Sequence, residues 1–136
     1  MNVWVTTEQK VDQNNEVKTY RNEVEGTLKQ RRVPYISYTE VLDAEQVEVR
    51  VKMDIEGIRI TRHGAIRMDF LFVYGTTTQN VYTTPAGRSV MDVTTTKLDY
   101  KAWDSGGRLV IHYKLSEHGA DLGQFKYQLD YKEITI

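Results

Sequence analysis

Apolar and charged residues alternate without interruption over residues 47–56 of the chain. A period of two is typical of a β-strand that has one buried face and one solvent-exposed face. The Glu56-Gly57 pair at the end of this stretch predicts a two-residue hairpin turn, in which glycine adopts a positive φ. This turn sets the register of the next strand. The resulting pairs are Ile55–Ile58, Met53–Ile60 and Val51–Arg62.

A second hairpin is predicted at His63-Gly64-Ala65, as a three-residue loop with a left-handed glycine. The two turns agree, because both place the apolar partners on one face of a three-stranded meander. A slip of one residue in either turn would expose that whole face to solvent. The pairs predicted for the second hairpin are Arg62–Ile66, Ile60–Met68 and Ile58–Phe70.

Turn-forming residues recur at short intervals in the rest of the chain and separate about ten strand candidates. No segment has an apolar 3.6-residue repeat long enough to predict a helix. Strands with one apolar face bury it in a sandwich or in a closed sheet, and short hairpin connections favour the closed sheet. We therefore predict an all-β fold, a closed or nearly closed antiparallel up-and-down β-barrel of about 8–10 strands, with a sandwich as the alternative.

Composition narrows the classes of function. A length of 136 residues is typical of one domain, so residues 1–136 are expected to form a single domain. The absence of cysteine excludes disulfides, thiolate metal ligands and cysteine nucleophiles. The 18 basic and 19 acidic side chains nearly cancel, which argues against a nucleic-acid partner. No apolar run approaches the roughly 20 residues that span a bilayer, and no signal-peptide pattern opens the chain, so we predict a cytoplasmic location without a membrane span.

Several short motifs are similar in order and spacing to those of a known family. They are the stretch from Arg62 to Met68 (RHGAIRM), Phe72, Gly75, Thr84-Pro85-Ala86-Gly87 and the Gly106-Gly107-Arg108 turn before the last hairpin. Across nearly the whole chain, this pattern resembles the YwiB-like family of small bacterial proteins. The resemblance implies a calycin-like barrel, similar in architecture to lipocalins and fatty-acid-binding proteins, and no established activity.

Arg62 is the most unusual residue of the predicted inner face. The register places its guanidinium among apolar side chains, where an uncompensated charge is very costly. Its partner is an anionic ligand, solvent at the rim of the barrel, several carbonyls, or a carboxylate of the protein. Glu40 is the natural internal partner if its strand places Ile36 and Tyr38 inside. The resemblance adds that fatty-acid-binding barrels hold carboxylates with interior arginines.

Aromatic residues complete a predicted ligand site around Arg62. A tyrosine ring supplies apolar area and its hydroxyl orients a ligand, although plain core packing explains the same residues. The first function hypothesis is therefore the binding of a small amphipathic or anionic ligand inside the barrel. The predicted ligand-binding residues are Arg62, Tyr20, Tyr74, Tyr113, Tyr127, Phe70 and Phe72.

The alternative hypothesis is a protein-interaction or homodimer module with a packed interior and no ligand. It depends on apolar residues predicted for the outer face, namely Leu71, Val73, Val90 and Val110. An enzyme is less favoured, and no catalytic residue is predicted, because the chain lacks a Gly-x-Ser-x-Gly elbow, a glycine-rich phosphate loop and a His-Glu-x-x-His pattern. The histidines have no metal-ligand spacing, so no metal and no cofactor are predicted.

Overall fold

The computed structural model describes residues 1–42 and 44–135, and every regular element in these ranges is a β-strand. The strands are β1 (Asn2–Gln13), β2 (Glu16–Lys29), β3 (Tyr35–Leu42), β4 (Glu45–Met53), β5 (Ile58–His63), β6 (Arg67–Phe72), β7 (Thr77–Thr84), β8 (Gly87–Trp103), β9 (Gly106–Glu117) and β10 (Ala120–Glu133). The predicted all-β fold is confirmed.

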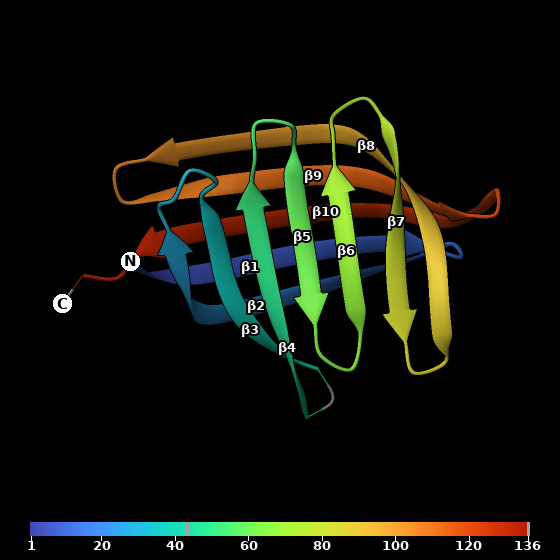
Figure 1. Ribbon diagram of the computed structural model, residues 1–136, viewed down its shortest axis with the longest axis horizontal. Helices are drawn as coiled ribbons and strands as arrows, with labels where there is room; N and C mark the ends of the chain where they lie inside the picture. Colours follow the sequence, from blue (N-terminus) through green and yellow to red (C-terminus); the bar gives the residue numbers. More distant parts are fainter. Residues whose placement is uncertain (43, 136) are drawn as a thin grey trace.

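The sheet closes on itself. Each strand pairs antiparallel with its neighbours in the sequence, and β1 also pairs with β10, from Val3–Glu133 to Asp12–Gln124. This strand order confirms the up-and-down barrel and excludes the sandwich. In Figure 1, β3 to β7 form a front layer that crosses β8, β9, β10, β1 and β2 behind it, so the barrel is flattened.

Strand β8 connects the two layers on the right of Figure 1. Its first half pairs with β7 and its second half with β9, and the register with β9 shifts between Thr95 and Lys97. A bulge inserts an extra residue into one strand and bends it. The bend allows β8 to leave the front layer and to continue in the rear layer, as strands do at the corners of orthogonally packed sheets.

The first hairpin turn has a different centre from the predicted one. Ile55 and Glu56 form its tip, because the backbones of Asp54 and Gly57 exchange two hydrogen bonds of 3.0 and 3.3 Å. Ile55, which was predicted to face inward, is therefore fully exposed. The observed pairs of β4 with β5 are Met53–Ile58, Val51–Ile60 and Val49–Arg62.

The second hairpin is displaced in the same way. His63 pairs with Arg67, and residues 64–66 form the loop. Both predicted registers are wrong by two residues, which is the period of a strand, so the residues that lie within the strands keep their predicted face. Ile66, which was predicted to face inward opposite Arg62, lies in the loop. The observed pairs of β5 with β6 are Arg62–Met68, Ile60–Phe70 and Ile58–Phe72.

Gly57 has a different role from the predicted one. Its φ is not positive. A β-carbon at this position would instead overlap the backbone carbonyl of Phe72 on the neighbouring strand. The glycine is required by the close approach of two backbones, which the local sequence of a turn does not reveal.

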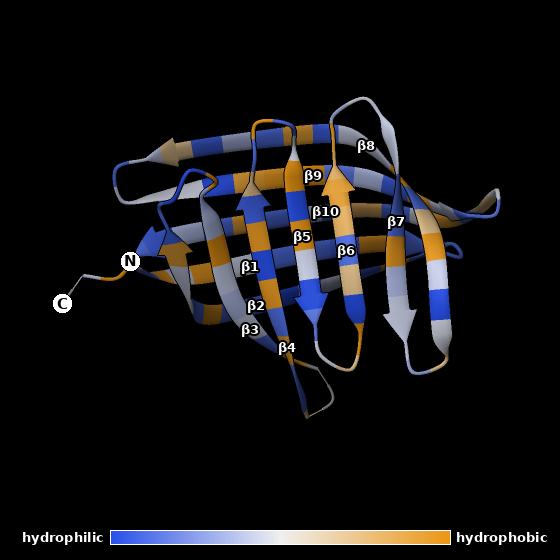
Figure 2. Ribbon diagram, in the orientation of Figure 1, coloured by the Kyte–Doolittle hydropathy of each residue, from blue (hydrophilic) through white to orange (hydrophobic). Residues whose placement is uncertain are grey.

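The inward-facing side chains form a largely apolar core, and Figure 2 shows the alternation of apolar and polar residues along the front strands. Aromatic rings pack across part of the interior. The ring centre of Phe72 lies 6.2 Å from that of Phe70 and 4.8 Å from that of Tyr113, which stacks on Phe125 at 5.2 Å. Packed rings therefore fill the interior between β6, β9 and β10.

Candidate functional site

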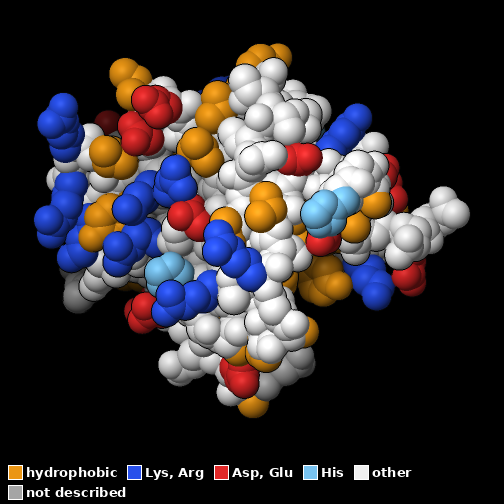
Figure 3. All heavy atoms as spheres, turned by 45° about the vertical axis from the view of Figure 1, so that its right-hand side comes forward, with side chains coloured by type: hydrophobic (Ala, Val, Ile, Leu, Met, Phe, Trp, Pro, Cys, Tyr) orange, Lys and Arg blue, Asp and Glu red, His pale blue; other side chains and the backbone are white. Residues whose placement is uncertain are grey.

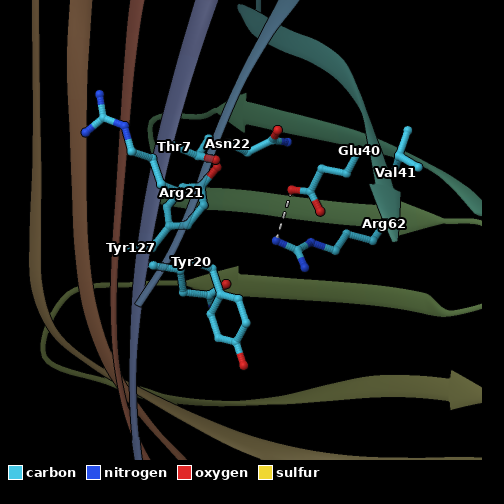
Figure 4. A pocket seen from close by; sticks show the side chains of 9 residues that line it. Thr7, Tyr20, Arg21, Asn22, Glu40, Val41, Arg62 and Tyr127 are labelled. Atoms are coloured by element: carbon cyan, nitrogen blue, oxygen red, sulfur yellow. Dashed lines mark ion pairs between the residues drawn. The ribbon is translucent and has the colours of Figure 1, made fainter. Parts of the chain in front are cut away.

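A pocket of about 330 Å³ opens in the wall of the barrel where β2 and β3 border it. Its volume is at the lower end of the range for small-molecule sites. The lining side chains come from β1, β2, β3, β5 and β10, and Figure 4 shows most of them around the central space. The lining residues are Thr7, Gln9, Tyr20, Arg21, Asn22, Glu40, Val41, Arg62 and Tyr127.

The pocket opens where β2 and β3 separate. In the described residues these strands pair only through Gly26–Lys29 and Tyr35–Tyr38, although β2 begins at Glu16. Gly26 is the last paired residue, and a β-carbon there would lie 2.6 Å from the carbonyl oxygen of Ser37. Glycine therefore permits the close crossing of the two strands, and beyond it the first half of β2 moves away from β3.

Arg62 and Glu40 form an ion pair inside the pocket. Nη2 of Arg62 lies 3.5 Å from Oε1 of Glu40, and the side chains are 22% and 11% exposed (Figure 4). The two residues belong to β5 and β3, which flank β4. They reach each other past Val47 and Val49, which are their cross-strand neighbours on β4. The predicted inward orientation of Arg62 is confirmed, and among the partners that the sequence left open for it, the structure shows the carboxylate of Glu40.

The guanidinium of Arg62 is charged but incompletely paired. Burial acts to lower the pKa of Arg62, but Glu40 and the surrounding tyrosines raise it by more, so the net change is upward. The 3.5 Å contact with Glu40 is longer than the roughly 2.7–2.9 Å of a charge-assisted hydrogen bond. Nε of Arg62 is buried and has no hydrogen-bond partner in the described part of the chain. The protein therefore leaves part of the donor capacity of Arg62 unused.

Tyrosine hydroxyls surround the ion pair. The Oη atoms of Tyr38 and Tyr127 lie 2.9 Å apart and join β3 to β10, and Nε2 of Gln9 donates to Oη of Tyr113 at 3.4 Å. Burial is the main cause that raises the pKa of Tyr38 and Tyr127, and it raises the pKa of Tyr113 to about 12. These hydroxyls are therefore neutral at physiological pH and serve as hydrogen-bonding groups and not as charges.

The structure places the predicted ligand residues in three environments. Arg62 and Tyr127 line the pocket, and so does Tyr20, which is 56% exposed. Tyr113, Phe70 and Phe72 are buried in the packed aromatic rings, and they are not among the residues that line this pocket. The inward placement expected for Tyr74 is wrong, since β6 ends at Phe72 and Tyr74 lies exposed in the connection to β7.

Three uncharged polar residues of the pocket, and the charged Arg21, were not predicted. Thr7 and Gln9 lie on β1, where they continue the alternation of the buried Val3 and Val5. Asn22 follows Tyr20 by two residues on β2 and therefore shares its face. A sequence signal exists for Thr7 and Gln9, because they continue the inward phase of apolar residues on β1. The phase of Asn22 on β2 also includes Lys18, so it gives no such signal.

The outer surface has mixed charge. Figure 3 shows Lys and Arg side chains gathered on one part of this face, with Asp and Glu among them. Arg59 forms an ion pair with Asp69, and the guanidinium of Arg50 lies 4.7 Å from the ring centre of Tyr35. Of the apolar residues predicted for the outer face, Val90 is exposed, whereas Leu71, Val73 and Val110 are partly buried.

Residues 1–42 and 44–135 contain neither a metal-binding cluster nor a membrane-spanning helix. No group of three or more His, Cys, Asp or Glu side chains there is arranged to hold a metal ion. No helix in these ranges is long and apolar enough to cross a membrane.

Comparison with known proteins places the chain in a family. A family model described as a domain of unknown function (DUF1934) matches residues 3–129. The chain belongs to this family. No curated protein is similar enough to this DUF1934 chain to count as a match. The name of the family assigns no activity to its members.

One solved structure has the same fold as this DUF1934 chain. The crystal structure of YwiB protein from Bacillus subtilis superposes with a TM-score of 0.81, covering 98% of this chain and 92% of that one. The two sequences are 22% identical, a level at which the likeness shows the fold alone. Together with the family model, this match confirms the resemblance to the YwiB-like family.

Proposed function

We propose that the protein binds a small amphipathic molecule with an anionic group, and that Arg62 holds this group in the pocket between β2 and β3. The observation that carries the proposal is the incomplete pairing of Arg62. A guanidinium inside a barrel normally has its donors satisfied, because a hydrogen-bond donor left without a partner away from water is costly. Here the contact with Glu40 measures 3.5 Å and Nε has no partner among the described residues.

The other lining residues support a ligand with an apolar part. Val41 and the rings of Tyr20 and Tyr127 supply apolar surface, while Thr7 and Asn22 supply hydrogen-bonding groups. Small-molecule sites typically combine an apolar lining with a few polar groups that fix the orientation of the ligand. The volume of about 330 Å³ favours a short ligand over a long acyl chain.

Octanoate is the probe that tests this proposal, with 1-octanol as the uncharged ligand of equal chain length. We expect octanoate to bind the wild type more tightly than octanol does. Arg62→Lys should weaken octanoate binding by about tenfold, because lysine keeps the charge but loses the forked donors. Chemical-shift titration of the backbone amides measures both affinities and shows which residues move.

Arg59→Lys is the matched control. Arg59 does not line this pocket, and its guanidinium forms an ion pair with Asp69 on the outer surface. Its substitution should leave octanoate binding unchanged. Equal binding of octanoate and octanol, or shifts that avoid β2, β3 and β5, would show that Arg62 does not hold the anion.

A protein-interaction or homodimer module is the second candidate. It is favoured by an outer groove of about 450 Å³ whose lining includes Ile55, Tyr74 and Tyr100, which are 100%, 66% and 39% exposed. Exposed apolar clusters of this kind often mark interaction sites. We expect the double substitution Ile55→Arg/Tyr74→Arg to dissociate a dimer of the wild type in size-exclusion chromatography with light scattering. If the wild type is already monomeric at high concentration, the homodimer form of this candidate is excluded.

A further inference from the structure

We infer that the ligand of the Arg62 pocket is a zwitterion of the α-amino acid class, with its carboxylate on Arg62 and its ammonium on Glu40. This inference rests on the proposed function and specifies its ligand. The pocket presents two opposite charges side by side, with Nη2 of Arg62 3.5 Å from Oε1 of Glu40. In an α-amino acid, the two charged groups are attached to one carbon, so they match this short separation.

A ligand with an anion alone matches the pocket less well. Glu40 already balances the charge of Arg62, so a second carboxylate on the same guanidinium would lie close to the carboxylate of Glu40. Like charges repel strongly where water is largely excluded, and the Glu40 side chain is only 11% exposed. An ammonium group beside Glu40 removes this repulsion and restores the neutrality of the site.

The geometry of the ion pair leaves hydrogen-bonding groups of both residues available to such a ligand. At 3.5 Å, neither partner satisfies the other with a short hydrogen bond. In Figure 4, one terminal nitrogen of Arg62 points to Glu40 and the other points away from Glu40. The first nitrogen contacts the carboxylate of Glu40, and the second nitrogen is in a position to donate to a ligand carboxylate.

Neighbouring polar groups suit the rest of an amino-acid head group. Thr7, Gln9 and Asn22 line the same space and supply both donors and acceptors. Arg21 adds no further positive charge to the interior, because Glu8 and Glu23 pair with it on the outside. Val41 and the ring of Tyr20 are near the mouth, where the side chain of an amino acid would extend.

Two sets of matched probes test the inference. Each set has an amino acid, the acid without its ammonium and the amine without its carboxylate: L-phenylalanine, 3-phenylpropanoate and 2-phenylethylamine, then L-leucine, 4-methylpentanoate and 3-methylbutylamine. We expect the amino acid of at least one set to bind the wild type at least tenfold more tightly than both of its analogues. Chemical-shift titration measures the six affinities under one condition.

Glu40→Gln supplies the second measurement. It keeps the shape and an acceptor oxygen but removes the negative charge, so the preference for the amino acid over the matched acid should disappear. Glu48→Gln, at an exposed residue of β4 that does not line this pocket, is the control and should keep the preference. If Glu40→Gln does not fold, the ranking on the wild type decides alone.

The outcomes separate the inference from the proposed function. If 3-phenylpropanoate and 4-methylpentanoate bind as tightly as the amino acids, the inference is wrong and the anion-binding function stands. If none of the six probes and no octanoate binds, both are wrong. A preference for the amino acid that persists in Glu40→Gln also overturns the inference, because the ammonium would then be recognised elsewhere.

Discussion

Glu40→Leu is expected to lower the free energy of unfolding by about 3 kcal/mol, because it leaves the buried guanidinium of Arg62 without its anion. Arg62→Leu should have a similar effect, since Glu40 is also buried and would lose its cation. The double substitution Glu40→Leu/Arg62→Leu should return to within about 1 kcal/mol of the wild type, since well-packed apolar residues commonly replace a buried ion pair without loss. Urea unfolding followed by circular dichroism measures all three variants.

An exposed ion pair of the same barrel is the control. Arg59 and Asp69 form a pair whose side chains are 41% and 54% exposed, so Arg59→Leu should cost less than about 1 kcal/mol. If the losses from Glu40→Leu and Arg62→Leu simply add in the double variant, the two charges do not depend on each other.

Phe72→Ala is expected to lower the free energy of unfolding by about 4 kcal/mol, the other large effect in this chain. Phe72 is 1% exposed, and its ring lies against Phe70 and Tyr113. Truncation removes apolar area from the core and leaves a cavity. The surrounding backbone cannot move to fill this cavity, because strand pairing in the closed sheet fixes it. Urea unfolding of the variant gives the loss directly.

Leu71→Ala is the matched control, because Leu71 precedes Phe72 on β6 and faces the outside, where it is partly buried. Its loss should be about 1 kcal/mol or less. A loss below about 1.5 kcal/mol for Phe72→Ala would mean that the rings do not pack tightly. The interior would then have room for a longer ligand than the pocket between β2 and β3 admits.

The alternation of residues predicted more of the fold than the turns did. The period of two over residues 47–56 identified the inner face of β4 correctly, and a displacement of two residues at each hairpin left most of that face unchanged. Ile55 and Ile66 are the exceptions, because the displacements moved them from the predicted strands into the turns. The position of a turn depends on how closely two backbones approach, as at Gly57 and Phe72. These residues are far apart in the sequence, so a local pattern does not reveal the approach.

The residues of the candidate site were also predicted only in part. Arg62 and Glu40 were predicted from their phase on the strands, since each continues a run of inward apolar residues. Tyr74 was misplaced because its phase could not be extended beyond the end of β6. Thr7 and Gln9 were missed because inward polar residues of β1 become a site only where another wall of the barrel faces them.

The sequence by itself determined the class of fold, the face of most strands and the presence of a charge inside the barrel, because each of these follows from a local period of two. Only the tertiary structure decided that β2 and β3 separate beyond Gly26 and that five strands contribute to one pocket. It also decided that the guanidinium of Arg62 lies 3.5 Å from Glu40. These features depend on the bending and closure of the whole sheet, and no local pattern encodes the distance between residues that only closure brings together.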